Sequence, residues 1–292
     1  LQEEPAKEAV LAEILAQDLG QYTEIVFCGY GEPTCRADDL FWLCDQLRAA
    51  GRADLPPIRL NTNGHGSLIH GRDVAPQLKG RIDVVSISLN GSTEEINAMT
   101  RDGYGPALRA LELLRRNGYR ETTLNWVMHA SNADDFPNVM ALAERYEVFR
   151  VVIIGLKPDS HKSLSTLPSR EQMERTADFA RSWRGRTRIF VEACYSPMLA
   201  LVSETKLFGN LNVGKHKGCP AGRTTFSVNV DGLLSPCRHQ RKLRTLEEQV
   251  QAPCCGCRFE KNCRHCLAIN AKLKGELFLG NEFCPIRQPC GA

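Results

Sequence analysis

The chain has 292 residues, of which 42% are apolar and 24% charged, a composition typical of globular proteins and unlike disordered or fibrous ones. Its formal net charge of +3 is too weak to indicate nucleic-acid binding. No segment approaches the roughly 18 consecutive apolar residues of a membrane span. The acidic start, residues 1–5, is unlike a signal peptide. We therefore expect a cytoplasmic protein that binds neither nucleic acid nor membrane.

The first two thirds of the chain alternate helical and strand patterns. Buried strands are expected at 24–28, 58–62, 82–89, 121–128 and 149–156, with 187–192 as an extension. Helices are expected at 5–19, 38–50, 72–79, 93–117, 134–146 and 170–183. Near-continuous apolar strands separated by helices predict a parallel sheet covered by helices. Because such folds open on a strand and this chain opens on a helix, we expect a strand upstream of the given sequence.

The composition changes near residues 205–218, and the rest of the chain is dense in Cys, Gly and Pro. A strand over 225–230, a turn at Asp231-Gly232 and a return through Leu233-Leu234 predict a hairpin. A helix is expected over 265–274. We predict two domains, residues 1–200 and 201–292. The second has too few apolar residues for a core of its own, so we expect bound metal to stabilise it.

The chain has 13 cysteines, nine of them from Cys219 to Cys290. An odd number of thiols in a large protein with its own core favours metal binding over disulfides. The run Cys254-x2-Cys257-x5-Cys263-x2-Cys266 separates its two pairs by five residues, whereas zinc ribbons use about 15–20. This spacing favours iron–sulfur clusters, with structural zinc as the alternative.

Glycine and polar residues follow three of the expected strands. The segments are Gly31-Glu32-Pro33-Thr34, Asn61-Thr62-Asn63-Gly64 and Ser88-Leu89-Asn90-Gly91. The carboxyl ends of parallel strands share one edge of the sheet, where α/β folds bind ligands. Together with the cysteine run, these segments predict a cofactor site at that edge.

These motifs resemble those of radical SAM enzymes, and the resemblance covers nearly the whole chain. It implies an α/β fold, a partial (β/α)6 barrel with a parallel sheet, which binds S-adenosyl-L-methionine (SAM). It places Arg101 near the SAM carboxylate and Leu156 on the adenine. The cofactor-binding residues that it implies are Gly31, Glu32, Pro33, Thr34, Asn61, Asn63, Ser88, Asn90, Arg101, Val127, Asn132 and Leu156.

The spacing Cys219-x12-Gly232-x4-Cys237, followed by the central run and Cys284, resembles the SPASM extension of these enzymes. The resemblance implies two auxiliary [4Fe–4S] clusters. The outer-cluster ligands would be Cys254, Cys257, Cys263 and Cys284, and the inner-cluster ligands Cys219, Cys237, Cys266 and Cys194. An open iron is the alternative to Cys194, and Cys290 the alternative to Cys284. The central run ends in Cys-x2-Cys where the family has Cys-x3-Cys.

One family motif is not found: no Cys-x3-Cys-x2-Cys, the loop that binds the catalytic cluster, occurs in the 292 residues. We expect the first strand and this loop to be missing from the given sequence, which would not cleave SAM without them.

The resemblance implies an enzyme that generates a 5′-deoxyadenosyl radical for hydrogen abstraction, with electrons from a flavodoxin- or ferredoxin-type reductant. We expect it to modify a peptide by crosslinking, thioether formation or epimerisation. The alternatives are a dehydrogenase or epimerase of a small molecule such as an aminocyclitol or sugar, and a non-enzymatic zinc or iron–sulfur protein. Candidate catalytic groups are Cys28 and Cys35, as hydrogen-atom donors, and Glu192, as a proton acceptor.

Overall fold

A computed structural model describes residues 5–28, 31–69, 72–157, 165–192, 195, 225–228, 234–237, 239 and 266. The expected helix over 265–274 therefore lies outside the described residues. So does most of the cysteine-rich region. None of the helices in the described part is long and apolar enough to cross a membrane.

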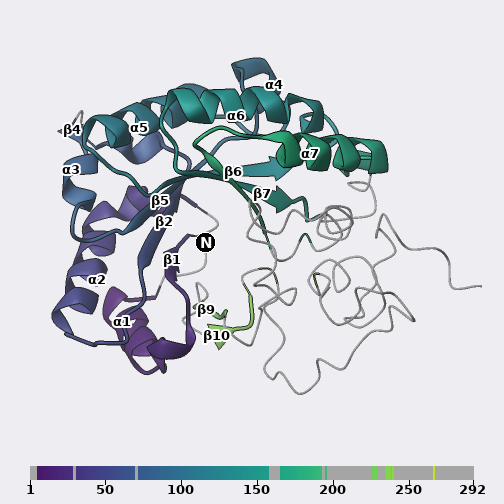
Figure 1. The fold of residues 1–292 in the computed structure, drawn as a ribbon. Helices are drawn as coiled ribbons and strands as arrows, with labels where there is room; N and C mark the ends of the chain where they lie inside the picture. The colour runs from purple at the N-terminus through teal and green to yellow at the C-terminus, as the bar shows by residue number, and fades with distance from the viewer. Residues whose placement is uncertain are drawn as a thin grey trace, which may run out of the picture.

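One six-stranded parallel sheet organises the described residues, in the order β1-β2-β5-β6-β7-β8. The strands are β1 (Ile25–Phe27), β2 (Ile58–Thr62), β5 (Val84–Ser88), β6 (Thr122–Met128), β7 (Arg150–Gly155) and β8 (Arg188–Val191). Figure 1 shows the sheet curving, with the helices along its outer side. This arrangement confirms the predicted parallel α/β fold. The ends of each strand differ from the predicted ends by a few residues at most.

Helices connect the successive strands. They are α1 (Lys7–Leu15), α2 (Ala37–Ala49), α3 (Ala75–Leu78), α4 (Glu94–Ala98), α5 (Tyr104–Arg116), α6 (Phe136–Arg145) and α7 (Arg170–Ser182). Four 3-10 turns accompany them: η1 (Leu19–Gln21), η2 (Pro33–Arg36), η3 (His65–Ser67) and η4 (Ala133–Asp135). Two short antiparallel pairs are β3 (Leu68–Ile69) with β4 (Arg72–Asp73), and β9 (Ser227–Val228) with β10 (Leu234–Ser235).

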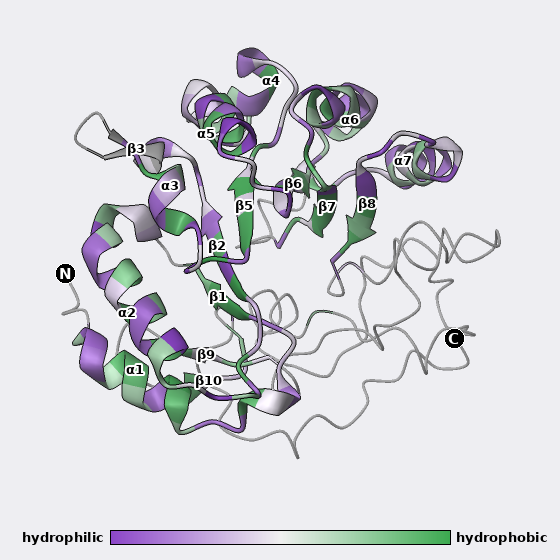
Figure 2. Ribbon diagram, turned by 60° about the vertical axis from the view of Figure 1, so that its left-hand side comes forward, coloured by the Kyte–Doolittle hydropathy of each residue, from purple (hydrophilic) through white to green (hydrophobic). Residues whose placement is uncertain are grey.

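Strand alternation separates a core face from a concave face. On β2, Ile58 and Leu60 are fully buried against the helices, whereas Arg59 and Asn61 are only partly buried and point to the other face. Figure 2 shows hydrophobic residues concentrated on the strands and on the sides of the helices that meet them. The core is therefore the layer between the sheet and its outer helices, and the concave face carries both polar groups, such as Asn61, and apolar ones, such as Val127 and Val152.

The predicted single helix over 93–117 is wrong. Helix α4 ends at Ala98 and α5 begins at Tyr104. Gly103 adopts a left-handed φ of +82°, which an L-residue with a side chain rarely adopts and which interrupts the helix. The break creates a turn at residues 99–103, and this turn carries Arg101 at the carboxyl edge of the sheet.

Two other predicted helices are shorter than expected. The range 72–79 opens as strand β4, and helix α3 occupies only Ala75–Leu78. The range 5–19 ends as a helix at Leu15. By contrast, Gly118 has a φ of +70° directly after the C-cap of α5, which confirms the predicted stop.

The predicted hairpin near residue 231 is confirmed by the pairing of β9 and β10. Phe226, just before β9, packs edge-on against Tyr22, with ring centroids 6.0 Å apart. The hairpin therefore lies beside the segment that leads into β1 (Figures 1 and 2). The proposed domain boundary near residue 200 stays a prediction.

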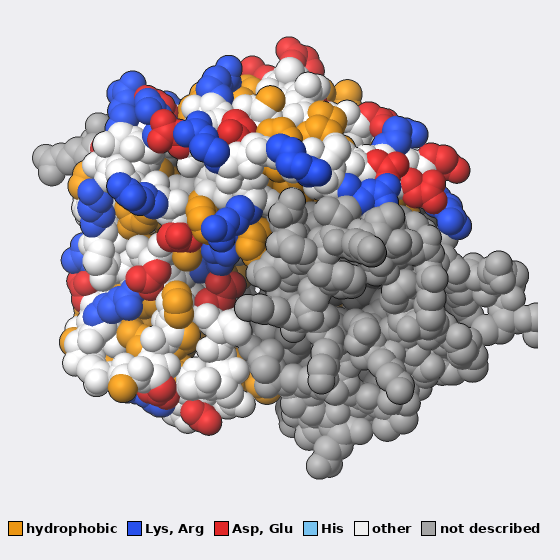
Figure 3. Space-filling view, in the orientation of Figure 1, with side chains coloured by type: hydrophobic (Ala, Val, Ile, Leu, Met, Phe, Trp, Pro, Cys, Tyr) orange, Lys and Arg blue, Asp and Glu red, His pale blue; other side chains and the backbone are white. Residues whose placement is uncertain are grey.

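On the face that Figure 3 shows, charged side chains of both signs are interspersed over the described residues. This distribution accords with the small net charge of +3.

Candidate functional site

Glu32 joins the carboxyl ends of two neighbouring strands. Its Oε1 accepts hydrogen bonds from the Thr34 amide (3.1 Å), the Thr34 hydroxyl (2.6 Å) and the Thr62 hydroxyl (2.6 Å). Its Oε2 accepts from the Asn63 amide at 2.8 Å. Both carboxylate oxygens are therefore committed to protein donors. Glu32 fixes the loop after β1 relative to the Asn-Thr-Asn-Gly segment after β2.

Two glycines permit the close approach of these loops. A Cβ on Gly66 would lie 1.8 Å from the Thr34 hydroxyl oxygen. Gly64 has a φ of +86°, and a Cβ there would lie 2.8 Å from the Pro106 carbonyl. The segment after β2 thus packs closely against both η2 and the start of α5, and at Gly64 and Gly66 a larger residue would collide with them.

Asn61 points from β2 toward the concave face and has an unused acceptor. Its Oδ1 is buried and has no hydrogen-bond partner. It pairs in register with Ser86, so Ser88, two residues further along β5, lies on the same face. Since buried polar atoms in proteins are nearly always hydrogen-bonded, Asn61 Oδ1 indicates a missing donor at this edge.

Asn90 and Asn132, both predicted to bind cofactor, lie in a buried network. The Asn90 side chain donates to the Thr100 hydroxyl (2.9 Å) and accepts from the Val127 amide (3.0 Å). Asn132 donates to the Asn90 and Val127 carbonyls (2.8 and 2.9 Å) and accepts from the His129 amide (2.7 Å). These side chains hold the ends of β5 and β6 together.

Arg101 lies on the turn between α4 and α5. Its Nε is buried without a partner, and no hydrogen bond or ion pair of its guanidinium is found among the described residues. Burial lowers the pKa of Arg101, and the negative charges of Asp102 and Glu32 oppose that shift. An arginine remains cationic in proteins. The guanidinium is thus a partly desolvated cation suited to an anionic group such as a carboxylate.

The remaining candidates lie at the ends of other strands. Glu192, after β8, forms an ion pair with Lys157, whose Nζ lies 2.8 Å from Glu192 Oε2. Leu156 is partly buried directly after β7. Cys28, after β1, and Cys35, in η2, are exposed free thiols.

Most of the predicted metal ligands lie outside the described residues: Cys194, Cys219, Cys254, Cys257, Cys263 and Cys284. Of the other two, Cys266 is buried and Cys237 partly buried. The Cys237 Sγ accepts a hydrogen bond from the His239 amide at 3.4 Å. Within the described part, no three potential ligands come together. The cluster ligands stay predictions.

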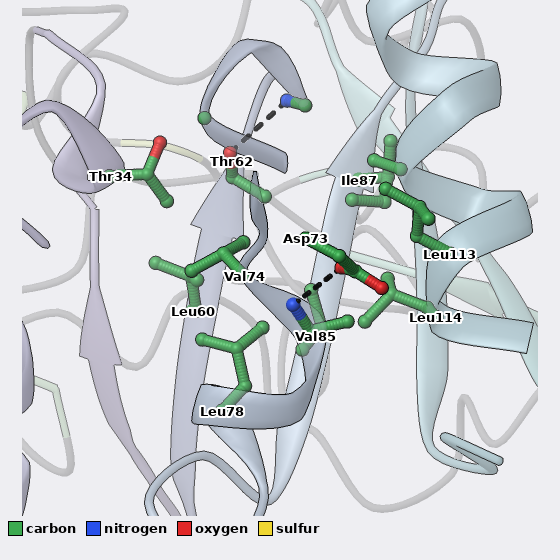
Figure 4. Close-up of a pocket in the computed structure, with 14 residues that line it drawn as sticks. Thr34, Leu60, Thr62, Asp73, Val74, Leu78, Val85, Ile87, Leu113 and Leu114 are labelled. Carbon is green, nitrogen blue, oxygen red and sulfur yellow. Dashed lines mark hydrogen bonds between the residues drawn. The ribbon is translucent and has the colours of Figure 1, made fainter. Parts of the chain in front are cut away.

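A pocket lies on the helix side of the sheet, near the carboxyl ends of β2 and β5. Figure 4 shows Leu60, Val85 and Leu114 lining it, with Thr34 and Thr62 at its upper end. Its lining is almost entirely apolar, and the Asp73 carboxylate on its wall accepts from the Ala75 amide at 2.8 Å. The pocket therefore belongs to the core and is separate from the concave face that Asn61 meets.

Sequence analysis did not single out Thr62 or Asn97 as site residues. Thr62 contacts Glu32, and its position between Asn61 and Asn63 was the available signal. Asn97 was assigned to the interior of one long helix, and the turn dipeptides Asp102-Gly103 and Gly105-Pro106 were the signal that the helix ends soon after it.

Comparisons with known proteins place this geometry in a family. Residues 2–143 match the model of the radical SAM superfamily. The mycofactocin maturase MftC of Mycobacterium ulcerans is 34% identical over 121 residues, which are 40% of this chain and 31% of that protein. MftC of Mycolicibacterium smegmatis is also 34% identical, over 40% of this chain and 29% of its own length. The chain thus spans about a third of the length of these relatives.

Solved structures share the fold across the chain. Streptococcus suis SuiB bound to S-adenosylmethionine has a TM-score of 0.66 at 12% identity, covering 96% of this chain and 70% of SuiB. SuiB bound to its precursor peptide SuiA has a TM-score of 0.68 at 12% identity, with 96% and 69% covered. The enzyme anSMEcpe with bound AdoMet and Cp18Cys peptide has a TM-score of 0.65 at 18% identity, with 95% and 84% covered.

The fold is a partial α/β barrel, and the candidate site residues lie at the carboxyl ends of its parallel strands. Residues 2–143 match the radical SAM superfamily, the family that the sequence motifs resemble. SAM and iron–sulfur clusters are the cofactors characteristic of that superfamily.

Proposed function

We propose that this chain binds SAM at the carboxyl edge of β1, β2, β5 and β6 and acts as a radical SAM enzyme on a peptide. The observation that carries the proposal is Arg101, a partly buried residue whose Nε is buried without a partner, at the same edge as the unpartnered Asn61 Oδ1. A SAM molecule offers a carboxylate for the first and nucleoside donors for the second. The donor set therefore fits the ligand.

Each residue has a distinct part in this proposal. Arg101 binds and orients the carboxylate of SAM. Glu32, already saturated with protein donors, orders the backbone of the loop that faces the methionine amino group. Val127 and Leu156 supply apolar surface that excludes water. Bound SAM would supply the radical chemistry for hydrogen abstraction from an unactivated carbon.

The 292 residues contain no Cys-x3-Cys-x2-Cys, so none of them is assigned to a SAM-binding cluster. We assign the C-terminal cysteines to two auxiliary [4Fe–4S] clusters, as their spacing predicts. A cytoplasmic location and a flavodoxin- or ferredoxin-type reductant complete the proposal, since thiols of this number stay reduced there.

A peptide substrate is supported by what the relatives bind. SuiB is solved with a precursor peptide, anSMEcpe with a Cp18Cys peptide, and MftC is named a maturase. The substrate of this chain is proposed from these proteins.

SAM binding tests the site. We expect the protein to bind SAM. Arg101→Lys should raise the dissociation constant for SAM about tenfold, because lysine cannot reproduce the planar fork of donors. Arg48→Lys is the matched control: Arg48 also has a buried unpartnered Nε, but it lies on α2 and binds Asp83. Equal effects of the two substitutions, or no SAM binding by the parent, would contradict the proposal.

The substrate class is tested separately, with the full-length protein, dithionite and SAM. Short peptides encoded beside the gene are compared with an aminocyclitol and a sugar. We expect a mass change in a peptide together with 5′-deoxyadenosine. Turnover of the aminocyclitol or sugar alone would overturn the peptide assignment and leave the SAM site intact.

A further inference from the structure

Asn97, near the end of α4, forms hydrogen bonds to the turn that carries Arg101. Its side chain is 1% exposed. Its Nδ2 donates to the Arg101 carbonyl at 3.0 Å and to the Asp102 carbonyl at 3.3 Å. Its Oδ1 accepts from the Asn90 amide at 2.9 Å. One buried amide thus ties the turn directly to the end of β5.

These bonds do more than end a helix. Helix α4 stops at Ala98, and its C-cap is Met99. A side chain that only capped α4 would bind the last carbonyls of that helix. Asn97 instead donates to carbonyls beyond the helix, at the residue that carries the unpartnered guanidinium and at the next one.

The surrounding packing gives this turn little freedom. A Cβ on Gly91 would lie 2.4 Å from the Asn97 amide nitrogen, so the end of β5 presses on α4 at this point. On the other side, a Cβ on Gly103 would lie 2.6 Å from the His65 ring. Asn90 also donates to Thr100, next to Arg101, at 2.9 Å. The turn is therefore held from both sides.

Arg101 is partly buried and its Nε has no partner, which is costly. The backbone of the turn sets the position from which its side chain extends and the direction in which it starts. We propose that Asn97 is a positioning residue that directs Arg101 toward the carboxylate of SAM. The inference rests on the proposed SAM site. Asn97 itself, fully enclosed by protein, makes no contact with the ligand.

The test compares SAM with 5′-methylthioadenosine, the same nucleoside without the aminocarboxypropyl group. Isothermal titration gives both dissociation constants for the full-length protein and its variants, and their ratio is the SAM preference. We expect Asn97→Ala to lower that preference about tenfold with little change in methylthioadenosine affinity. Asn97→Asp, which is isosteric and keeps the acceptor for the Asn90 amide, should act likewise, because an ionised carboxylate cannot donate to the two carbonyls.

Two further variants separate positioning from stability. Asn117→Ala is the matched control: the Asn117 amide also donates to two acceptors, Asp73 and the Leu113 carbonyl, both at 2.8 Å, but far along α5. It should lower the melting temperature without changing the preference. In an Arg101→Ala background, Asn97→Ala should have no further effect on the preference, because the two act as one unit.

The outcomes distinguish the two proposals. A parent protein without preference for SAM overturns the proposed function, and this inference with it. If the parent protein prefers SAM, two results overturn this inference alone. One is that the Asn97 variants keep the preference, and the other is that Asn97→Ala lowers it as much in the Arg101→Ala background as in the parent. If Asn97→Ala fails to fold, Asn97→Asp decides.

Discussion

The Thr62 hydroxyl at the end of β2 lies 2.6 Å from Oε1 of Glu32, which follows β1. This bond crosses between adjacent strands of the sheet, whose register pairs Phe27 with Leu60. It makes the loop after β1 and the loop after β2 one structural unit. Both loops carry residues predicted to bind SAM, so the geometry of the site depends on this carboxylate.

Replacing Glu32 with Gln tests that dependence. The amide nitrogen of glutamine cannot accept a hydrogen bond, so at least one of the four donors to Glu32 loses its partner. We expect the free energy of unfolding to fall by about 1–3 kcal/mol, measured by urea denaturation. Glu174→Gln, on an exposed ion pair with Arg170, should change it by about 0.5 kcal/mol or less. Equal losses in the two variants would show that Glu32 has no special role.

Gly66→Ala and Gly105→Ala should have opposite effects. At Gly66 the new methyl group would collide with Thr34, whereas at Gly105, in the first turn of α5, nothing lies within 4 Å. We expect a loss of about 1–3 kcal/mol at Gly66 from overpacking and a gain of about 0.5–1 kcal/mol at Gly105 from helix propensity. Thermal and urea melts measure both. A neutral Gly66→Ala would mean that the two loops separate easily.

The described cysteines should differ sharply in reactivity. Burial raises the pKa of the Cys44 thiol to about 12, and its side chain is fully enclosed. Cys28 and Cys35 are exposed. Since the thiolate is the reactive form, iodoacetamide near neutral pH should label Cys28 and Cys35 and reach Cys44 only after denaturation. Peptide mapping by mass spectrometry follows each site, and rapid labelling of Cys44 in the native protein would contradict the described packing.

Metal content tests the assignment of the C-terminal cysteines. Two [4Fe–4S] clusters predict roughly eight iron atoms per chain and a broad absorbance near 400 nm in protein prepared without oxygen. Cys257→Ala and Cys263→Ala should each lower the iron content, whereas Cys44→Ala, in the core of the sheet domain, should not. A colourless protein that carries zinc would refute the cluster assignment.

Local pattern was enough to predict the sheet. The strand at 149–156 was recognisable as a near-continuous apolar run, which is typical of parallel strands, and the chain supplies that run at β7. The strand at 58–62 was recognisable from its alternation of apolar and polar residues, which β2 shows. Glu32 and Asn61 were also within reach of sequence analysis, because they lie at or after the carboxyl ends of neighbouring strands. Arg101 was predicted from the resemblance to radical SAM enzymes.

The break between α4 and α5 had a local signal that the prediction of one helix over 93–117 left out. Asp102-Gly103 and Gly105-Pro106 are dipeptides typical of turns, and Gly103 takes a left-handed conformation against the ring of His65. Which polar residues bond to other protein groups, and which keep an unpaired atom, could also be known only from the fold. Asn90 and Asn132 bind protein groups, while Asn61 and Arg101 keep buried atoms unpaired.

The sequence by itself determined the order of strands and helices, because burial periodicity is written in neighbouring residues. It also determined the chemical types of group at the carboxyl edge. Only the tertiary structure decided which of those groups face one another. The Glu32 carboxylate accepts a hydrogen bond from Thr62 on the neighbouring strand, and the Asn97 amide donates to the Arg101 carbonyl in a turn that was predicted as helix. Hydrogen-bond partners are set by distance in space, and a sequence pattern records only distance along the chain.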